Sequence, residues 1–297
     1  MKQLIPLIFS LAILGLFLIG CESISDPEPV SDVLFPTGET SGLGKLSGDI
    51  TKEMCKEDPG WEALGFRNLG QCVRYVMTGK DSRPSDNGMT VIDIDGNEYQ
   101  TVTIGDQVLM AENLRTTRYS DGTSIPTGLT NPEWDGTTDG AYAIYPHSET
   151  DGLNSDAEVV AVYGKLYNWY AVDDGGLCPT GWHVPSDEEW TILTDYLGGS
   201  SVAGGKMKTT GTIEDGDGLW YSPNTGATNE SGFSGLPGGA RRFKGEFSDV
   251  GYSGYWWSSS DYDAIRAWYI YLDYYYSDVD RHVYGKEYGF SVRCLRD

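Results

Sequence analysis

The first pattern of apolar and polar positions is a single apolar run close to the N-terminus. Lys2 precedes this run, which covers residues 4–18, and Gly20-Cys21 follows it almost at once. A positive start, an apolar segment and small residues at the cleavage point are typical of a secretory signal peptide. The run is shorter than the roughly 20 residues of a spanning helix, so an uncleaved membrane anchor is the weaker alternative. We therefore expect a lipoprotein signal peptide at residues 1–20 and lipidation of Cys21.

The next two segments contain little apolar surface. Residues 22–45 are rich in Ser, Asp, Glu, Pro, Gly and Thr, a composition that cannot bury enough surface to offset the entropy of ordering. We expect residues 21–45 to form a flexible tether. Residues 46–88 hold two cysteines and end in a polar linker, and a segment this small usually needs a staple or a neighbour. We expect a disulfide-stapled unit that leans on the main domain, with an apolar cluster of Trp61, Leu64, Phe66, Leu69, Val73 and Val76.

The main domain, residues 89–297, begins with the alternation that is typical of strands. Alternating residues over 91–95 and 99–104 flank an Asp-Gly turn dipeptide, which predicts a β-hairpin. A second turn leads into a third strand at 108–110. Towards the C-terminus the pattern becomes one of short strands between Gly-rich loops. Strands are expected there at 254–258, 264–272 and 289–295.

Two helices are expected in the same domain. Large side chains over residues 163–170 recur at the spacing of one helical face. The second helix begins with Ser186 as N-cap and Glu189 completing a capping box, and it ends before Gly198-Gly199. Its buried stripe comprises Trp190, Leu193 and Leu197. Together these elements predict an α+β domain with two helices, an antiparallel sheet and long Gly-rich loops.

The charge balance narrows the classes of partner. The sequence has 21 basic and 44 acidic residues, a formal net charge of −23. Cleavage after residue 20 would remove Lys2 and no acidic residue, leaving 20 basic against 44 acidic residues and a charge of −24. Phosphates would be repelled, so we expect no nucleic acid as a partner.

The cysteine count points to an oxidising compartment. If Cys21 carries lipid, four cysteines remain: Cys55, Cys72, Cys178 and Cys294. An even number outside the cytosol suggests two disulfides, and the sequence allows three pairings. Proximity along the chain favours Cys55–Cys72, which leaves Cys178–Cys294.

Several motifs of the main domain carry a family resemblance. They are Asp95-Gly96-Asn97-Glu98-Tyr99, Ile104-Gly105-Asp106-Gln107, Met110-Ala111-Glu112-Asn113-Leu114, Tyr163-Gly164-Lys165-Leu166-Tyr167-Asn168-Trp169, Cys178-Pro179-Thr180-Gly181-Trp182-His183-Val184-Pro185-Ser186, Glu188-Glu189-Trp190, Gly232-Phe233-Ser234, Trp256-Trp257-Ser258-Ser259-Ser260 and Ser291-Val292-Arg293-Cys294. In this order they resemble the Fibrobacter succinogenes major paralogous domain family over residues 89–297. The resemblance implies a C-type lectin-like fold, distantly akin to formylglycine-generating enzymes, in an exported lipoprotein. It also supports a Cys178–Cys294 disulfide.

Little in the sequence favours catalysis. Formylglycine-generating enzymes use a pair of reactive cysteines, whereas both cysteines of this domain have structural roles in our interpretation. Of the three histidines, His183 sits in a family motif and is interpreted as a packed residue rather than a base. Carboxylate pairs are common in the acidic turns and therefore carry almost no specificity for a glycosidase. We expect a protein that is not an enzyme.

Two acidic segments invite a calcium interpretation. Asp93, Asp95 and Asn97 resemble the start of a calcium loop, but position 104 holds Ile where the distal Glu is required, so a hairpin is the better explanation. The expectation is no cofactor, with calcium as the minor alternative. The weak metal candidates are Glu214, Asp215 and Asp217.

Clustered aromatic residues are the remaining signal for function. Consecutive aromatics on a strand point to opposite faces, so Trp256 and Trp257 cannot share one core, and one of them is expected to fill it. Exposed rings on loops could stack on sugars or anchor a protein. Within residues 212–284 the candidate ligand-binding residues are Trp220, Tyr221, Trp257, Asp261, Asp263, Tyr274, Tyr275 and Tyr276, with Asp273 as a further acceptor.

The function we predict is non-catalytic binding at the cell envelope. The protein would be exported and lipid-anchored, at the outer membrane or the cell surface, and its lectin-like domain would contact a glycan or a surface protein. The alternative is a structural envelope protein without a specific small ligand. A polysaccharide-acting enzyme is the least favoured reading.

Overall fold

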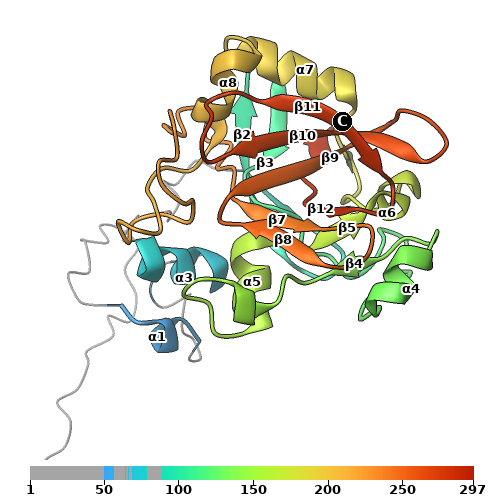
Figure 1. Ribbon diagram of the computed structural model, residues 1–297, viewed down its shortest axis with the longest axis horizontal. Helices are drawn as coiled ribbons and strands as arrows, with labels where there is room; N and C mark the ends of the chain where they lie inside the picture. Colours follow the sequence, from blue (N-terminus) through green and yellow to red (C-terminus); the bar gives the residue numbers. More distant parts are fainter. Residues whose placement is uncertain (1–49, 57–63, 65, 67–68, 79–88) are drawn as a thin grey trace, which may run out of the picture. The chain divides into compact units, whose positions relative to one another are not determined.

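The computed structural model describes residues 50–56, 64, 66, 69–78 and 89–297 (Figure 1). The expected signal peptide, Cys21, the tether, Trp61 and the linker at 81–88 lie outside these residues. Within the described part of the chain, no helix is long and apolar enough to cross a membrane.

A five-stranded sheet joins the beginning and the end of the main domain. Its order is β1-β2-β3-β13-β6, and every neighbouring pair is antiparallel. Its strands are β1 (Thr90–Ile92), β2 (Glu98–Ile104), β3 (Gln107–Met110), β6 (Trp182–His183) and β13 (Leu295–Arg296). The predicted hairpin and third strand are confirmed, and Gly96 and Gly105 adopt the positive φ values that the two turns require.

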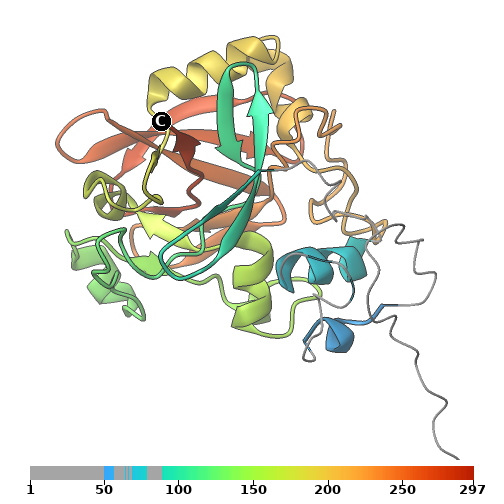
Figure 2. The same ribbon diagram turned by 180° about the vertical axis from the view of Figure 1, so that it is seen from behind.

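An eight-stranded sheet forms the second layer (Figures 1 and 2). Its main path runs β11-β10-β9-β7-β12-β5-β4, and β8 pairs with β7. The strands are β4 (Tyr142–Ala143), β5 (Leu166–Asn168), β7 (Gly238–Arg241), β8 (Phe247–Val250), β9 (Ser253–Asp261), β10 (Arg266–Asp273), β11 (Asp280–Gly285) and β12 (Gly289–Phe290). The single strand expected at 289–295 is wrong, because β12 lies in this sheet whereas β13 lies in the five-stranded one.

The helices also differ from the prediction. They are α4 (Asn131–Gly136), α5 (Asp156–Tyr163), α6 (Trp169–Asp173), α7 (Asp187–Tyr196) and α8 (Ser200–Met207), with a 3₁₀ turn at His147–Glu149. The predicted capping box of α7 is confirmed. The helix expected over 163–170 is wrong: α5 ends at Gly164, whose φ of 78° is unfavourable for other residues, and the chain then enters β5.

Both tryptophans of the Trp256-Trp257 pair are fully buried. They point to opposite faces of β9, so each enters a different core. Trp257 packs with Tyr269 and Phe290, whereas Trp256 packs with Ile270, Leu272 and Trp190. A strand covered on both faces explains why neither ring is left at the surface.

Among residues 50–78, the described part packs against the main domain through α5. Here α1 (Lys52–Lys56) and α3 (Leu69–Thr78) are joined by the Cys55–Cys72 disulfide. Both cysteines belong to an apolar cluster that includes residues of α5. Lys52 and Lys56 both contact the buried carboxylate of Glu158 on α5. The second disulfide, Cys178–Cys294, closes a loop of 116 residues, which in the chain-entropy model stabilises the fold by about 4–5 kcal/mol.

Candidate functional site

Residues 273–279, which we call the tyrosine loop, connect β10 to β11 beside α8 (Figure 1). The side chains of Tyr275 and Tyr276 are 57% and 55% exposed. Consecutive rings meet edge-on: Tyr274 and Tyr275 lie at 64°, and Tyr275 and Tyr276 at 78°. An edge-on pair covers at most one ring face. The loop therefore presents open aromatic faces to solvent.

A buried lysine holds both ends of the tyrosine run. The ammonium group of Lys208 donates hydrogen bonds to the carbonyl oxygens of Asp273 and Tyr276, at 2.7 and 2.6 Å. Lys208 is fully buried, and desolvation lowers its pKa to about 8 although Asp273 and Asp278 lie near it. Trp220 places its ring 5.5 Å from the same ammonium group. Lys208 thus fixes the loop from beneath.

Gly204 of α8 lets the loop approach the helix backbone closely. A Cβ atom at Gly204 would lie 1.9 Å from the carbonyl oxygen of Asp278. Gly205 N donates to Ser277 O at 2.8 Å, and Val279 N donates to a carbonyl of α8 at the same distance. The tyrosine loop is therefore bonded to α8 along its second half.

The carboxylate of Asp273 orders the first half of the loop. One oxygen accepts from Tyr275 N at 2.7 Å, and the other accepts from the hydroxyl of Tyr271 on β10. Together with Lys208 and α8, this contact fixes the backbone of the loop that carries the rings. A preorganised surface loses less conformational entropy on binding.

Two further tyrosines join this run in what we call the tyrosine cluster: Tyr221, Tyr252, Tyr274, Tyr275 and Tyr276. Tyr252, Tyr275 and Tyr276 are exposed, whereas Tyr221 is half-buried and Tyr274 is half-buried against the core. The rings of Tyr221 and Tyr252 are 4.4 Å apart, and those of Tyr252 and Tyr274 are 5.3 Å apart. Tyr221 donates its hydroxyl to Asp151 at 2.7 Å, a hydrogen bond that raises the pKa of Tyr221 to about 12. Tyr252 escaped the sequence analysis because only the pairing of Ser253 with Asp273 brings it to the loop.

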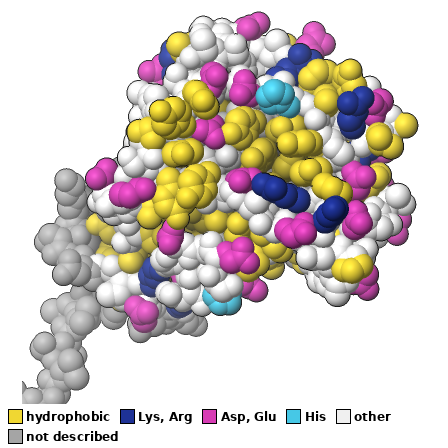
Figure 3. Space-filling model, in the orientation of Figure 1, with side chains coloured by type: hydrophobic (Ala, Val, Ile, Leu, Met, Phe, Trp, Pro, Cys, Tyr) yellow, Lys and Arg dark blue, Asp and Glu magenta, His cyan; other side chains and the backbone are white. Residues whose placement is uncertain are grey.

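A second group of aromatic rings covers the outer face of β9–β11, where Figure 3 shows hydrophobic side chains gathering. In this tyrosine stack, Tyr284 lies between Tyr269 and Tyr288, with interplanar angles of 8° and 6°. Tyr269 is only 5% exposed. Parallel neighbours cover both ring faces of Tyr284, which is nevertheless 43% exposed. The sequence analysis missed this stack, although Tyr269 and Tyr271 carry the alternation of one strand face.

The structure removes four residues from the candidate site. Trp220 and Trp257 are fully buried in separate cores, and the indole of Trp220 donates to Thr209 Oγ1 at 3.0 Å. Asp261 and Asp263 lie at the opposite end of the β9–β10 hairpin, roughly 25 Å away at about 3.3 Å per residue. Asp263 instead pairs with Arg266 at that turn.

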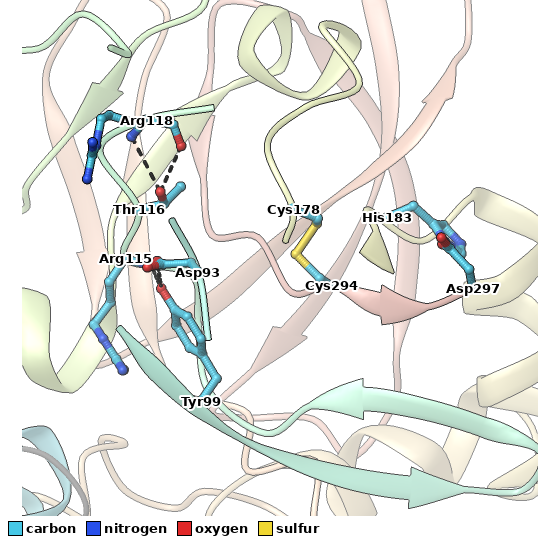
Figure 4. Close-up of a disulfide and its surroundings, with 9 residues drawn as sticks. All are labelled: Asp93, Tyr99, Arg115, Thr116, Arg118, Cys178, His183, Cys294 and Asp297. Carbon is cyan, nitrogen blue, oxygen red and sulfur yellow. Dashed lines mark hydrogen bonds and ion pairs between the residues drawn. A yellow bond between two sulfur atoms is a disulfide. The ribbon is translucent and has the colours of Figure 1, made fainter. Parts of the chain in front are cut away.

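Figure 4 shows the surroundings of the Cys178–Cys294 disulfide. His183 lies there with its side chain 40% exposed, so it is half-buried and held by polar contacts and is not packed in the core. Its Nδ1 is 2.6 Å from Asp297 and its Nε2 is 3.0 Å from Glu189. Burial alone would lower the pKa of His183, but the two carboxylates raise it overall. The arrangement stabilises the imidazolium form.

The acidic segments considered for calcium are bonded to protein donors. The carboxylate of Asp93 accepts hydrogen bonds from the Asp95 and Asn97 amides and from the Tyr99 hydroxyl (Figure 4), which supports the hairpin explanation. Glu214 accepts from Ser222 N, whereas Asp215 and Asp217 both accept from Thr212. Among the described residues no His, Cys, Asp and Glu side chains form a group of three or more that could hold a metal ion.

Comparison with known proteins places most of the main domain in a sequence family. The sequence model of the Fibrobacter succinogenes major domain matches residues 102–296. No curated protein and no solved structure matches the chain. The match begins within β2, includes α7, α8 and the tyrosine loop, and ends in β13. The chain therefore belongs to the Fibrobacter succinogenes major domain family.

Proposed function

We propose that this protein is an exported lipoprotein whose C-type lectin-like domain binds a glycan through the tyrosine cluster without transforming it. The signal-peptide pattern and Cys21 support the lipid anchor. The α+β architecture with long loops supports the lectin-like assignment. Loops on a rigid scaffold are where binding residues tend to collect.

The observation that carries the proposal is the exposure of Tyr275 and Tyr276 on a loop whose backbone is held by three sets of hydrogen bonds. Lys208, Asp273 and α8 each hold the backbone of this loop. The exposed rings of Tyr275 and Tyr276 contribute little to the core, yet the backbone that carries them is held by a buried ammonium group, whose desolvation is costly. Such an arrangement is typical of a binding surface, in which aromatic side chains supply rigid contact area.

The test compares the full chain with a Tyr275→Ser/Tyr276→Ser variant on arrays of glycans and surface proteins. We expect at least one glycan to be bound by the parent chain and lost in the variant. Tyr262→Ser is the matched control, because Tyr262 is 50% exposed and lies at the other end of the β9–β10 hairpin. Equal binding by the parent and the double variant would refute the assignment of the site.

The lipid anchor has a separate test. Mass spectrometry of the membrane fraction should find an acylated N-terminal peptide that begins at Cys21. A Cys21→Ala protein should leave the membrane fraction, because acylation of this thiol is the proposed attachment. An equally membrane-bound Cys21→Ala protein would contradict lipidation as the means of anchoring.

A further inference from the structure

We infer that the tyrosine cluster accepts uncharged glycans and rejects anionic ones, an inference that rests on the binding function proposed above. Carboxylates border the cluster on several sides. The carboxylate of Asp151 accepts a hydrogen bond from the hydroxyl of Tyr221 at 2.7 Å. The carboxylate of Glu214 accepts one from the backbone amide of Ser222, the residue after Tyr221, at 2.9 Å. The carboxylate of Asp273 accepts a hydrogen bond from the backbone amide of Tyr275. The cluster therefore combines aromatic faces with negatively charged acceptors.

Three cations on segments that carry or contact the cluster are already paired or buried. Lys208 is fully buried and directed at the carbonyl oxygens of Asp273 and Tyr276. Lys206, on the same segment, pairs with Glu230 at 2.9 Å. Arg242 lies 3.6 Å from Asp249. An incoming carboxylate or sulfate would thus meet acceptors and like charges, with none of these three cations free to receive it.

Sugar rings suit this combination of groups. A pyranose presents an apolar C–H face, which can lie against an aromatic ring, and hydroxyl donors at its edge, which carboxylates accept. A uronate or a sulfated sugar offers the same face but adds negative charge beside Asp151 and Glu214. Specificity then comes from repulsion of the wrong ligand as much as from contacts with the right one.

The experiment compares polymers that share a backbone and differ in charge. Affinity electrophoresis of the full chain would use hydroxyethylcellulose against carboxymethylcellulose, and methyl-esterified against de-esterified homogalacturonan. We expect a neutral polymer to bind at least about tenfold more tightly than its anionic partner at low ionic strength. The difference should shrink in roughly 0.5 M salt, because exposed charges are screened there.

A variant without the charges of Asp151 and Glu214 tests whether these carboxylates cause the rejection of anionic glycans. In Asp151→Asn/Glu214→Gln each amide oxygen can still accept the native hydrogen bond while the charge is removed. The ratio of the affinity for the anionic polymer to that for the neutral polymer should rise about threefold or more, because both ligands lose the same charged acceptors but only the anionic one is relieved of repulsion. Asp135→Asn is the control, because Asp135 is exposed on α4, away from α8 in both views (Figures 1 and 2). An Asp151→Asn/Glu214→Gln variant that leaves this affinity ratio unchanged would contradict the inference.

The outcomes distinguish a failure of the charge selection from a failure of the proposed binding function. Tyrosine-dependent binding of an anionic polymer, as tight as that of its neutral partner, would overturn the charge selection and leave the binding function intact. Tyrosine-dependent binding of a basic peptide in place of every glycan would overturn the ligand class. Binding that survives Tyr275→Ser/Tyr276→Ser, or no binding of any polymer or peptide, would remove the proposed function itself.

Discussion

The tyrosine stack and the tyrosine cluster have similar composition but opposite physical roles. In the stack, the ring of Tyr284 lies parallel to those of Tyr269 and Tyr288, and Tyr269 is 5% exposed whereas Tyr284 is 43% exposed. In the cluster, Tyr275 and Tyr276 are more than half exposed and meet edge-on. Edge-on contacts occur in both groups, since the buried ring of Tyr269 meets that of Trp257 at 82°. Exposure of the rings, more than their number or the angle between them, distinguishes Tyr275 and Tyr276 from Tyr269.

The strongest test of this comparison is Tyr269→Ala. Removing a buried ring from a core that includes Trp257 and Phe290 should destabilise the protein by about 3–5 kcal/mol. Urea unfolding would measure the loss. Where the variant remains folded, ligand binding should persist, because Tyr269 lies outside the cluster. A destabilisation below roughly 1 kcal/mol would show that the stack is not part of the core.

A smaller effect on stability but a larger one on binding is expected for Gly204→Ala. The new methyl group would lie 1.9 Å from Asp278 O, so the tyrosine loop or α8 must move. We expect about 1–3 kcal/mol of destabilisation and at least roughly tenfold weaker binding, because the rings lose their fixed position. Ser201→Ala, on the exposed side of the same helix, is the control. Unchanged binding in Gly204→Ala would mean that the fixed loop is not required.

The weakest effect on stability concerns His183, which lies in the five-stranded sheet and not in the cluster. Its pKa is raised in the folded protein, so its contribution to stability is fully present below the unfolded pKa of about 6.5. That contribution should be lost as the pH rises through the folded pKa. The difference in unfolding free energy between the parent and His183→Ala should therefore narrow with rising pH, by less than about 1 kcal/mol for so exposed a pair. A difference that grows with pH would contradict the imidazolium bridge, and a parallel change in binding would contradict its separation from the site.

Local signals predicted the parts of the fold that depend on neighbouring residues. The hairpin at Gly96 and the capping box of α7 are of this kind, and the run of three tyrosines was visible as a candidate site. The helix over 163–170 failed because one residue, Gly164, with its positive φ, outweighed an apparent periodicity.

The rest of the site depends on contacts that are distant in sequence. Trp220 was wrongly placed in the site because its burial is set by tertiary packing, which composition does not reveal. Lys208 lies 68 residues from Tyr276, whose carbonyl oxygen it holds, and Tyr252 reaches the loop only through strand pairing. Gly204 gave no signal because its role is to leave room for a segment that follows much later in the chain.

The central claim is that the exposed rings of the tyrosine loop serve binding and not the core. The most direct measurement determines ligand affinity and the thermal midpoint on the same sample of Tyr275→Ser/Tyr276→Ser, using a glycan bound by the parent chain. We expect binding to be abolished while the free energy of unfolding changes by less than about 1 kcal/mol, as for exposed surface positions. A loss of several kcal/mol with binding retained would contradict the claim and assign these rings to the core.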